Sequence, residues 1–403
     1  MQISESFLRI IKKPVIKFIL IITLYDILIF SLFLVINPNI LDWLFDDKYV
    51  INNELIYYVD FRPGYPPIGK LPYTFLYKVF GNAESIVLYN LIMTNLTLII
   101  LYKLLKEVTS RRKAIILTSI VALQPVLIWS TIFSTHADTV ALFWLILTIY
   151  YIKAKNPLGV GLSAALGFLT KIYNAILMIP AFVLFKGRER VVLVSSFITI
   201  IILMSAPYLS LDPLMYITTY LHHLSRGPSE SIFALLDGYY SHTGFPHPTF
   251  EAMIYAWQFN AIYTPSNIDH FNYAWNYPQL RYISSTLQIF FLLLFSILLS
   301  KMRHEIEVLK TTSLAALSYF VFSAFWNPPI SLPTFILVTL TTLDVKTLYQ
   351  VLILACFMII DLIHAAIWIP GSPIDICVGL LVVTISRALL ISTALYITTK
   401  IMR

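Results

Sequence analysis

The sequence predicts an all-α membrane protein that crosses the bilayer many times, with about twelve membrane helices or half-helices. Of its 403 residues, 58% are hydrophobic and 12% are charged, and the mean hydropathy is +0.79. Soluble domains contain about 25% charged residues. Apolar stretches recur along the whole chain, so residues 1–403 are treated as a single transmembrane domain. The net charge of +7 does not indicate nucleic-acid binding, because short loops between the apolar stretches account for it.

Spanning a bilayer as a helix takes roughly 20 apolar residues. One pair of apolar segments, 158–170 and 172–185, is hinged at Lys171. Each segment is short, so this pair is either two crossings or a re-entrant hairpin. Either choice leaves both termini on one side. The first apolar run follows several cations but lacks a signal-peptide cleavage pattern, so it is interpreted as a helix. The other candidate spans are 17–36, 85–105, 114–133, 137–152, 191–208, 282–300, 311–326, 331–343, 347–369 and 375–399.

The charges predict the orientation of these spans. Of the 28 Lys and Arg residues, 20 fall on the side of the termini, seven on the opposite side, and Arg387 lies within a span. By the positive-inside rule the termini are cytoplasmic. Thirteen of the 21 acids and six of the eight histidines fall on the outer side. Two outer segments are long, 37–84 and 209–281, and we expect the functional site to be built from them.

The first outer segment supplies the candidate catalytic acids. Asp46, Asp47 and Asp60 could deprotonate an acceptor hydroxyl or hold a divalent cation (Mg²⁺ or Mn²⁺). Asp60 stands out, because three prolines within 62–67 restrict the backbone beside it. Arg62 places a cation next to this acid. The alternative for loop acids is that they only solvate the surface.

Three further candidates lie in and near short loops. His136 and Asp138 fall between two predicted spans, where Asp138 could instead cap the helix that starts at Thr139. Lys171 lies within an apolar stretch, where a lysine is costly unless it reaches the interface. If it points into a cavity, it suits a phosphate group.

The second outer segment begins with a cluster of basic residues. In a helix, His222 and Arg226 lie one turn apart on one face, and Gly227-Pro228 would end that helix. Arginine and histidine can both donate to a phosphate. An interfacial amphipathic helix is the alternative. The many aromatic residues that follow suit either sugar stacking or a membrane-interface belt.

Ionisable residues also lie inside the predicted spans. Asp361 and His364 share a helix face, and Asp361 could pair with Arg387 on the next helix. We favour such a structural ion pair over a proton relay.

Four patches in order resemble the GT-C superfamily of multi-spanning glycosyltransferases, nearest the polyprenyl-phosphate-mannose-dependent mannosyltransferases of the GT87/DUF2029 and GPI mannosyltransferase I types. They are Tyr58 to Pro67 (Tyr-x-Asp-Phe-x-x-x-Tyr-Pro-Pro), Phe133 to Asp138 (with Ser-x-His-x-Asp), Lys171 with Tyr173 and Pro180, and His223 with Arg226, Gly227, Glu230 and Ser231.

The resemblance implies an inverting transfer from a dolichyl- or polyprenyl-phosphate sugar, with a first-loop Asp as base. It also implies that basic residues hold the donor phosphate, with Tyr173, His223 and Glu230 among the binding residues. Relatives carry an acid where this chain has Gly64, and this loop has no Asp-x-Asp. The identity of the base and the need for a metal therefore stay open.

The expected partners are the lipid-linked donor, a glycan or lipid-linked acceptor, and membrane lipid. The expected location is the cell membrane of an archaeon or bacterium, or the endoplasmic reticulum of a eukaryote, with the site outside the cytoplasm. A transporter or flippase of a lipid-linked sugar, working through Asp361, His364 and Arg387, is the alternative.

Overall fold

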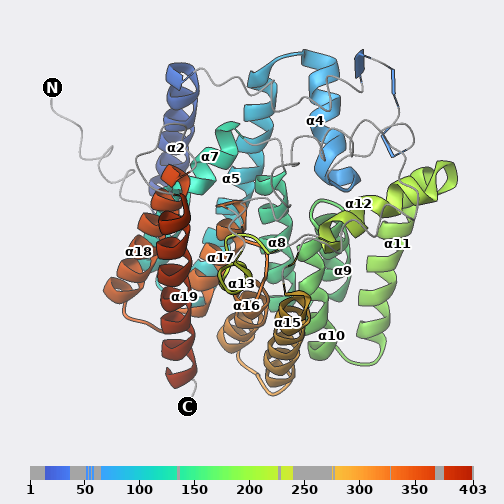
Figure 1. The fold of residues 1–403 in the computed structure, drawn as a ribbon. Helices are drawn as coiled ribbons and strands as arrows, with labels where there is room; N and C mark the ends of the chain where they lie inside the picture. The colour runs from blue at the N-terminus through green and yellow to red at the C-terminus, as the bar shows by residue number, and fades with distance from the viewer. Residues whose placement is uncertain are drawn as a thin grey trace.

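The computed structural model describes residues 14–36, 51–52, 54–55, 57–58, 65–133, 137–225, 228–238, 275, 277–326, 328–367 and 376–401. These residues form a bundle of helices (Figure 1). The long and medium helices are α2 (Pro14–Ile36), α4 (Pro67–Phe80), α5 (Ala83–Val108), α6 (Arg111–Ala122), α7 (Pro125–Phe133), α8 (Asp138–Lys153), α9 (Pro157–Phe168), α11 (Arg188–Leu211), α12 (Pro213–Ser225), α15 (Pro278–Leu299), α16 (Glu305–Val321), α17 (Pro328–Thr341), α18 (Thr347–Ile367) and α19 (Ile376–Ile401).

Helices occur at every apolar segment that the sequence singles out, which agrees with an all-α polytopic chain. Among the described residues, four helices are long and apolar enough to cross a membrane: α5, α11, α15 and most of α18. A fifth span results if α6 and α7 count as one broken helix. The other apolar helices do not meet this criterion over the residues that could be tested, so the expected number of about twelve crossings stays a prediction.

The break between α6 and α7 has a local cause. The sequence predicts one span over 114–133, but the two helices meet at a bend of 55°. Pro125 cannot donate a backbone hydrogen bond, and its ring excludes the preceding helical turn. The side chain of Gln124 then accepts from the backbone NH of Leu127 at 2.6 Å, which satisfies a donor at the start of α7.

The segment around Lys171 forms a hairpin. After α9 the chain turns at 169–171 and returns through a 3₁₀ helix, η2 (Ile172–Leu177), and α10 (Met178–Leu184). Both η2 and α10 pack against α9. The hairpin therefore places Lys171 at its tip, whether the legs span the membrane or re-enter it.

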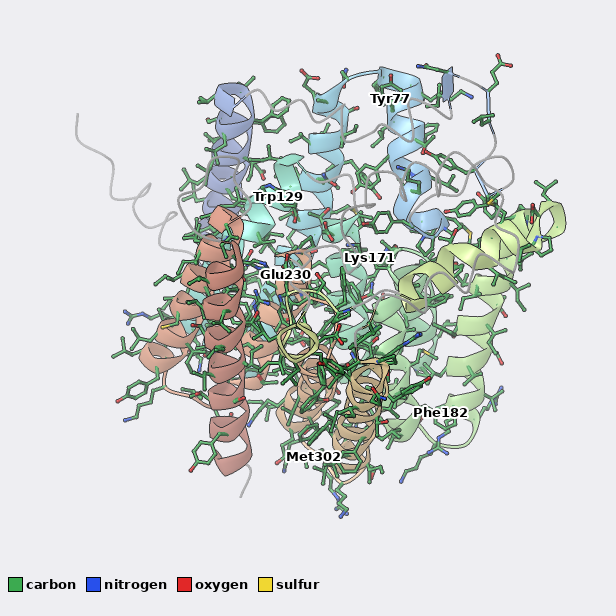
Figure 2. All side chains as sticks on the ribbon, viewed as in Figure 1. Tyr77, Trp129, Lys171, Phe182, Glu230 and Met302 are labelled. Atoms are coloured by element: carbon green, nitrogen blue, oxygen red, sulfur yellow. The ribbon has the colours of Figure 1, made fainter. Side chains whose placement is uncertain are left out.

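The ends of several helices opposite that tip are joined by polar contacts. Lys153 at the end of α8 donates to Glu107 at 2.6 Å and lies 2.7 Å from Glu305 at the start of α16. The hydrogen bond from Lys153 lowers the pKa of the Glu305 carboxyl. Lys113, at the start of α6, donates to two carbonyls of the turn 343–345. Met302, in the α15–α16 turn, lies at this same end (Figure 2). Basic turns that are far apart in the sequence thus gather at one end of the bundle.

Close helix packing depends on a glycine in α9. A Cβ on Gly161 would lie 1.9 Å from Ser196 Oγ and 2.6 Å from the Leu193 carbonyl oxygen of α11. Small residues let membrane helices approach in this way.

At the far end of α11 the chain turns into α12, which lies across the bundle (Figure 1). Tyr216 of α12 is buried and Ile217 is exposed, as in an amphipathic helix.

The chain after α12 is attached to the second half of the bundle. Within 228–238, Ser229 accepts from the backbone NH of Trp326 at 2.7 Å and donates to the Ala324 carbonyl at 2.9 Å. The short helix α13 (Ile232–Asp237) follows. Its last residue, Asp237, accepts from the backbone NH of Tyr277 at 2.7 Å, which holds together the two ends of the stretch between them.

Candidate active site

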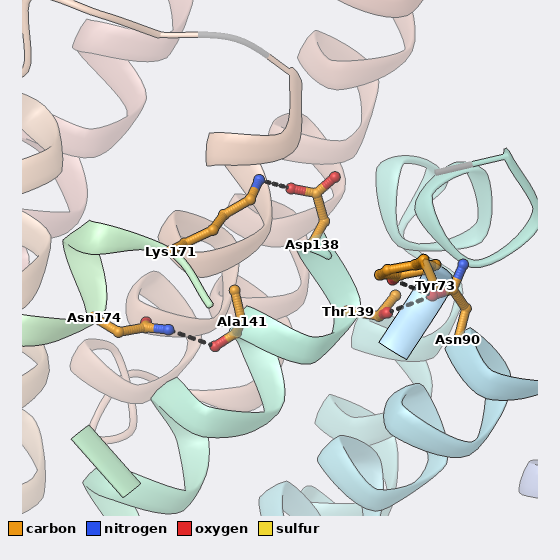
Figure 3. A network of polar contacts seen from close by, with 7 residues as sticks. All are labelled: Tyr73, Asn90, Asp138, Thr139, Ala141, Lys171 and Asn174. Carbon is orange, nitrogen blue, oxygen red and sulfur yellow. Dashed lines mark hydrogen bonds and ion pairs between the residues drawn. The ribbon is translucent and has the colours of Figure 1, made fainter. Parts of the chain in front are cut away.

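An ion pair between Lys171 and Asp138 is the centre of the candidate site (Figure 3). Lys171 lies at the tip of the α9 hairpin, and Asp138 is the first residue of α8. The two side chains are 13% and 1% exposed, so the charges are largely removed from solvent. The residue before Asp138, Ala137, has a φ of 57°, which is uncommon for a residue with a Cβ. The capping role considered for Asp138 does not occur: α8 starts at Asp138 itself, and its carboxylate contacts Lys171.

The beginning of α4 is attached to the same hairpin tip. The backbone NH groups of Ile68 and Gly69 donate to the Leu169 carbonyl at 2.9 and 3.2 Å. A Cβ on Gly69 would lie 2.5 Å from the carbonyl oxygen of Thr170, so only glycine allows this approach. The Tyr-Pro-Pro turn that precedes α4 is therefore fixed beside Lys171.

Aromatic rings and a second lysine border the ion pair. The ring centre of Tyr65 lies 5.3 Å from Lys171 Nζ, and the hydroxyl of Tyr58 donates to the Tyr65 carbonyl at 2.7 Å. Lys70, only 4% exposed, has its Nζ 5.9 Å from the ring centre of Tyr57. Rings at these distances attract ammonium groups. Two buried lysines thus flank the turn, an arrangement that favours an anion.

Tyr173 lies on the other side of Lys171. Its ring meets Phe320 of α16 edge to face at a centroid distance of 5.4 Å. It also interacts electrostatically with Lys171 and Asp138. The start of η2 therefore joins the hairpin tip to the second half of the bundle.

Buried hydrogen bonds beside the ion pair support this arrangement (Figure 3). Asn90 of α5, which is fully buried, accepts from the Tyr73 hydroxyl at 2.7 Å and from Thr139 at 3.2 Å. Its amide donates to the Thr131 carbonyl at 3.3 Å. Asn174 donates to the Ala141 carbonyl at 3.1 Å. One asparagine thus links α4, α5, α7 and α8 next to Asp138, and the other holds η2 against α8.

The described residues contain no group of three His, Cys, Asp or Glu side chains that could hold a metal ion. The acids predicted as possible metal ligands, Asp46, Asp47 and Asp60, lie outside the described residues. The hypothesis of a divalent cation is therefore untested.

The structure brings together the described members of three of the four sequence patches: Tyr58 and Tyr65, Asp138, and Lys171 with Tyr173. Glu230 belongs to a separate cluster, where its carboxylate contacts His364. The backbone of His222 and His223 lies in α12, but their side chains are not described. The remaining predicted site residues lie outside the described residues: Asp46, Asp47, Asp60, Arg62, His136 and Arg226.

Sequence reasoning did not single out Lys70 and Asn90. The sequence predicts 37–84 as an outer loop and assigns Lys70 no role in it, whereas α4 is helical within this segment. The buried positions Pro67, Lys70 and Tyr73 are spaced by three, which is a helical signal. Asn90 gave no comparable signal within its apolar helix.

The expected contact between Asp361 and Arg387 takes another form. Arg387 donates to His364 Nδ1 at 2.9 Å, while Asp361 accepts from Gln124 at 2.7 Å. No ion pair joins Asp361 to Arg387 within the part of the chain that the structure describes. Arg387 instead contacts His364 and the backbone carbonyl of Glu230, which the 228–238 segment brings to these helices.

Residues 65–211 match the family model described as dolichyl-phosphate-mannose-protein mannosyltransferase. This family is of the GT-C type. The match supports a GT-C membrane glycosyltransferase. It covers just over a third of the chain and includes the Tyr-Pro-Pro turn, Asp138, Lys171 and Tyr173, whereas Glu230 and everything after it lie beyond it. The finer likeness to the GT87 and GPI mannosyltransferase I types stays a prediction, and the transporter alternative is not favoured. The comparison with curated proteins gives no match.

Proposed function

We propose that this chain is an inverting glycosyltransferase that moves mannose or a similar hexose from a polyprenyl-phosphate-linked donor to a lipid-linked glycan or other acceptor outside the cytoplasm. One observation carries the proposal. Within the family-matched region, the Lys171–Asp138 pair and the Tyr-Pro-Pro turn lie against each other, although they are far apart in the sequence.

Lys171 is the proposed ligand of the donor phosphate. Its ammonium is already paired with Asp138, so an incoming phosphate would share or take over that contact. A lysine is a compact point charge whose three N–H donors suit a phosphate. Lys70, in the first turn of α4, would add a second positive charge. Arg226 remains a proposed third ligand from the sequence.

The reaction needs a base on the acceptor side. The acceptor hydroxyl would give its proton to a carboxylate while its oxygen bonds to the anomeric carbon of the donor sugar. The bond from that carbon to the phosphate oxygen breaks, and its electron pair leaves with the lipid phosphate. Lys171 would stabilise the negative charge that develops there. Attack from the opposite face inverts the anomeric configuration.

Asp60 is the proposed base, with Asp47 and Asp46 as the other candidates. Asp60 follows Tyr58 by two residues, and Tyr58 is tied to the turn beside Lys171. This proximity in the chain supports Asp60 over the acids farther from the turn.

Transfer of labelled sugar from polyprenyl-phosphate-mannose to glycan acceptors in membranes tests the proposal. We expect Asp60→Asn or Asp47→Asn to reduce transfer by about 100-fold or more, in line with the loss of a general base. Glu54→Gln is the matched control, because Glu54 is exposed and close in sequence. Full activity when Asp60 and Asp47 are changed together would refute the assignment.

A further inference from the structure

A second buried cluster of ionisable groups lies outside the family-matched region. It consists of Glu230 on the 228–238 segment, His364 on α18 and Arg387 on α19. The three residues are 3%, 0% and 3% exposed. Figure 2 shows Glu230 midway along the bundle rather than at its surface end. Burying these groups is costly unless each finds partners, so their contacts are informative.

The backbone of Glu230 also contacts the C-terminal helices. Its carbonyl accepts from the Thr384 hydroxyl at 3.3 Å and from Arg387 at 3.5 Å. Its φ is 49°, a left-handed conformation that residues with a Cβ rarely adopt. The surrounding contacts must therefore determine this conformation.

The hydrogen-bond directions fix the protonation of His364. Arg387 can only donate, so the Nδ1 atom of His364, 2.9 Å away, must accept and carries no proton. The proton of the neutral ring is then on Nε2, which donates to the Glu230 carboxylate. His364 thus acts as an uncharged bridge that accepts from the arginine and donates to the glutamate.

Arg387 extends the same arrangement to the chain beside Glu230. Its guanidinium lies 4.4 Å from the ring centre of Trp326, and the backbone NH of Trp326 donates to the Ser229 carbonyl. Ser231, which follows Glu230, donates from its hydroxyl to the Ala324 carbonyl at 2.5 Å. The contacts from α18, α19 and the 324–326 turn all converge on residues 229–231.

We propose that His364 and Arg387 are positioning residues that fix Glu230, and through it the 228–238 segment, against the C-terminal helices. We name these three residues the Glu230 anchor. This inference rests on the proposed function in one respect: the anchored segment directly follows Arg226, a proposed phosphate ligand. The anchor would hold the end of the donor-binding segment in place.

Substitutions of His364 test whether its ring acts as a hydrogen-bond bridge or only fills space. His364→Gln keeps one acceptor and one donor without charge, His364→Lys keeps only donors, and His364→Phe keeps neither. A spin label is attached at Leu236→Cys, an exposed position of α13, after both native cysteines are replaced by serine. Label mobility reports the order of the segment without using the reaction, and transfer is measured on the same variants.

We expect the label to be immobile in the unmodified background and in His364→Gln, and mobile in His364→Phe and His364→Lys. Transfer should follow the same order, with kcat/KM reduced roughly tenfold or more only in the mobile variants. An immobile label in His364→Phe would overturn the anchor. If the label is as immobile in His364→Lys as in the unmodified background, the bridging role of the neutral ring is overturned.

The two proposals fail in different ways. Absence of transfer from the unmodified protein, with the expected pattern of mobility, would refute the glycosyltransferase and leave the anchor standing. Normal transfer in His364→Phe with a mobile label would refute the positioning role alone.

Discussion

Replacing Lys171 by methionine should reduce both stability and activity. The change leaves Asp138, whose side chain is 1% exposed, without its ammonium partner. Removing one member of a buried ion pair costs about 3–5 kcal/mol of folding free energy, because a charge then stays buried without compensation. Sugar transfer should also be lost, because no ammonium remains to hold the donor phosphate.

The double variant Lys171→Met/Asp138→Leu separates the two effects. With both charges gone, the penalty of the lone carboxylate disappears, so the double variant should be more stable than the single one. Recovery should be partial, because Asp138 also makes other contacts that leucine cannot replace. Activity should stay absent, because the lysine is still missing.

Thermal unfolding of the purified protein in detergent and transfer assays on the folded fraction provide the two measurements. Lys310→Met is the matched control, because Lys310 is 5% exposed and pairs with Asp344 at the basic end of the bundle. It should lose stability yet keep its activity per folded molecule. A fully active double variant would refute the role of Lys171 in donor binding. A single variant as stable as the unmodified protein would refute the energetic reasoning.

Three further changes test how the site is held. Gly69→Ala should reduce transfer strongly, because its Cβ would lie 2.5 Å from the Thr170 carbonyl oxygen and push α4 from the hairpin tip. Asn90→Leu should destabilise the protein by about 1–3 kcal/mol in thermal unfolding, because buried hydroxyl and carbonyl groups lose their partner. Gly161→Ala should lower the unfolding temperature without a specific loss of transfer, because Ser196 and the α11 backbone leave no room for a methyl group.

Gly81→Ala is the control for the first of these changes. Gly81 ends α4 with a φ of 63°, and a Cβ there would meet nothing within 4 Å. Its cost is local backbone strain of about 1–2 kcal/mol. If it reduced transfer as much as Gly69→Ala, the close approach to Thr170 would not be the reason for the loss.

The sequence predicts the helical segments well because length and apolarity are local properties. It does not predict the bend before Pro125, because apolarity continues through it. It also places α4 inside a loop, since its prolines and lysines conceal the buried face that includes Pro67, Lys70 and Tyr73.

For the site, the sequence identifies Asp138 and Lys171 as separate candidates. It cannot pair them, because they are 33 residues apart in the sequence, with most of α8 and all of α9 between them. The same limit applies to Arg387. In the sequence, Asp361 on the preceding helix is the obvious partner for Arg387. In the structure, Arg387 instead contacts Glu230, which is 157 residues away in the sequence. Pairings of this kind depend on how the chain folds back, which residue spacing does not encode.

The hydrogen bond from the backbone NH of Tyr277 to the Asp237 carboxylate joins the two ends of the stretch between these residues. Because the two ends are held by each other and by α13 and α15, lengthening or exchanging the residues between them changes the entropy of loop closure only slowly. The number and identity of the residues between Asp237 and Tyr277 can therefore change with little effect on the packing of α13 and α15.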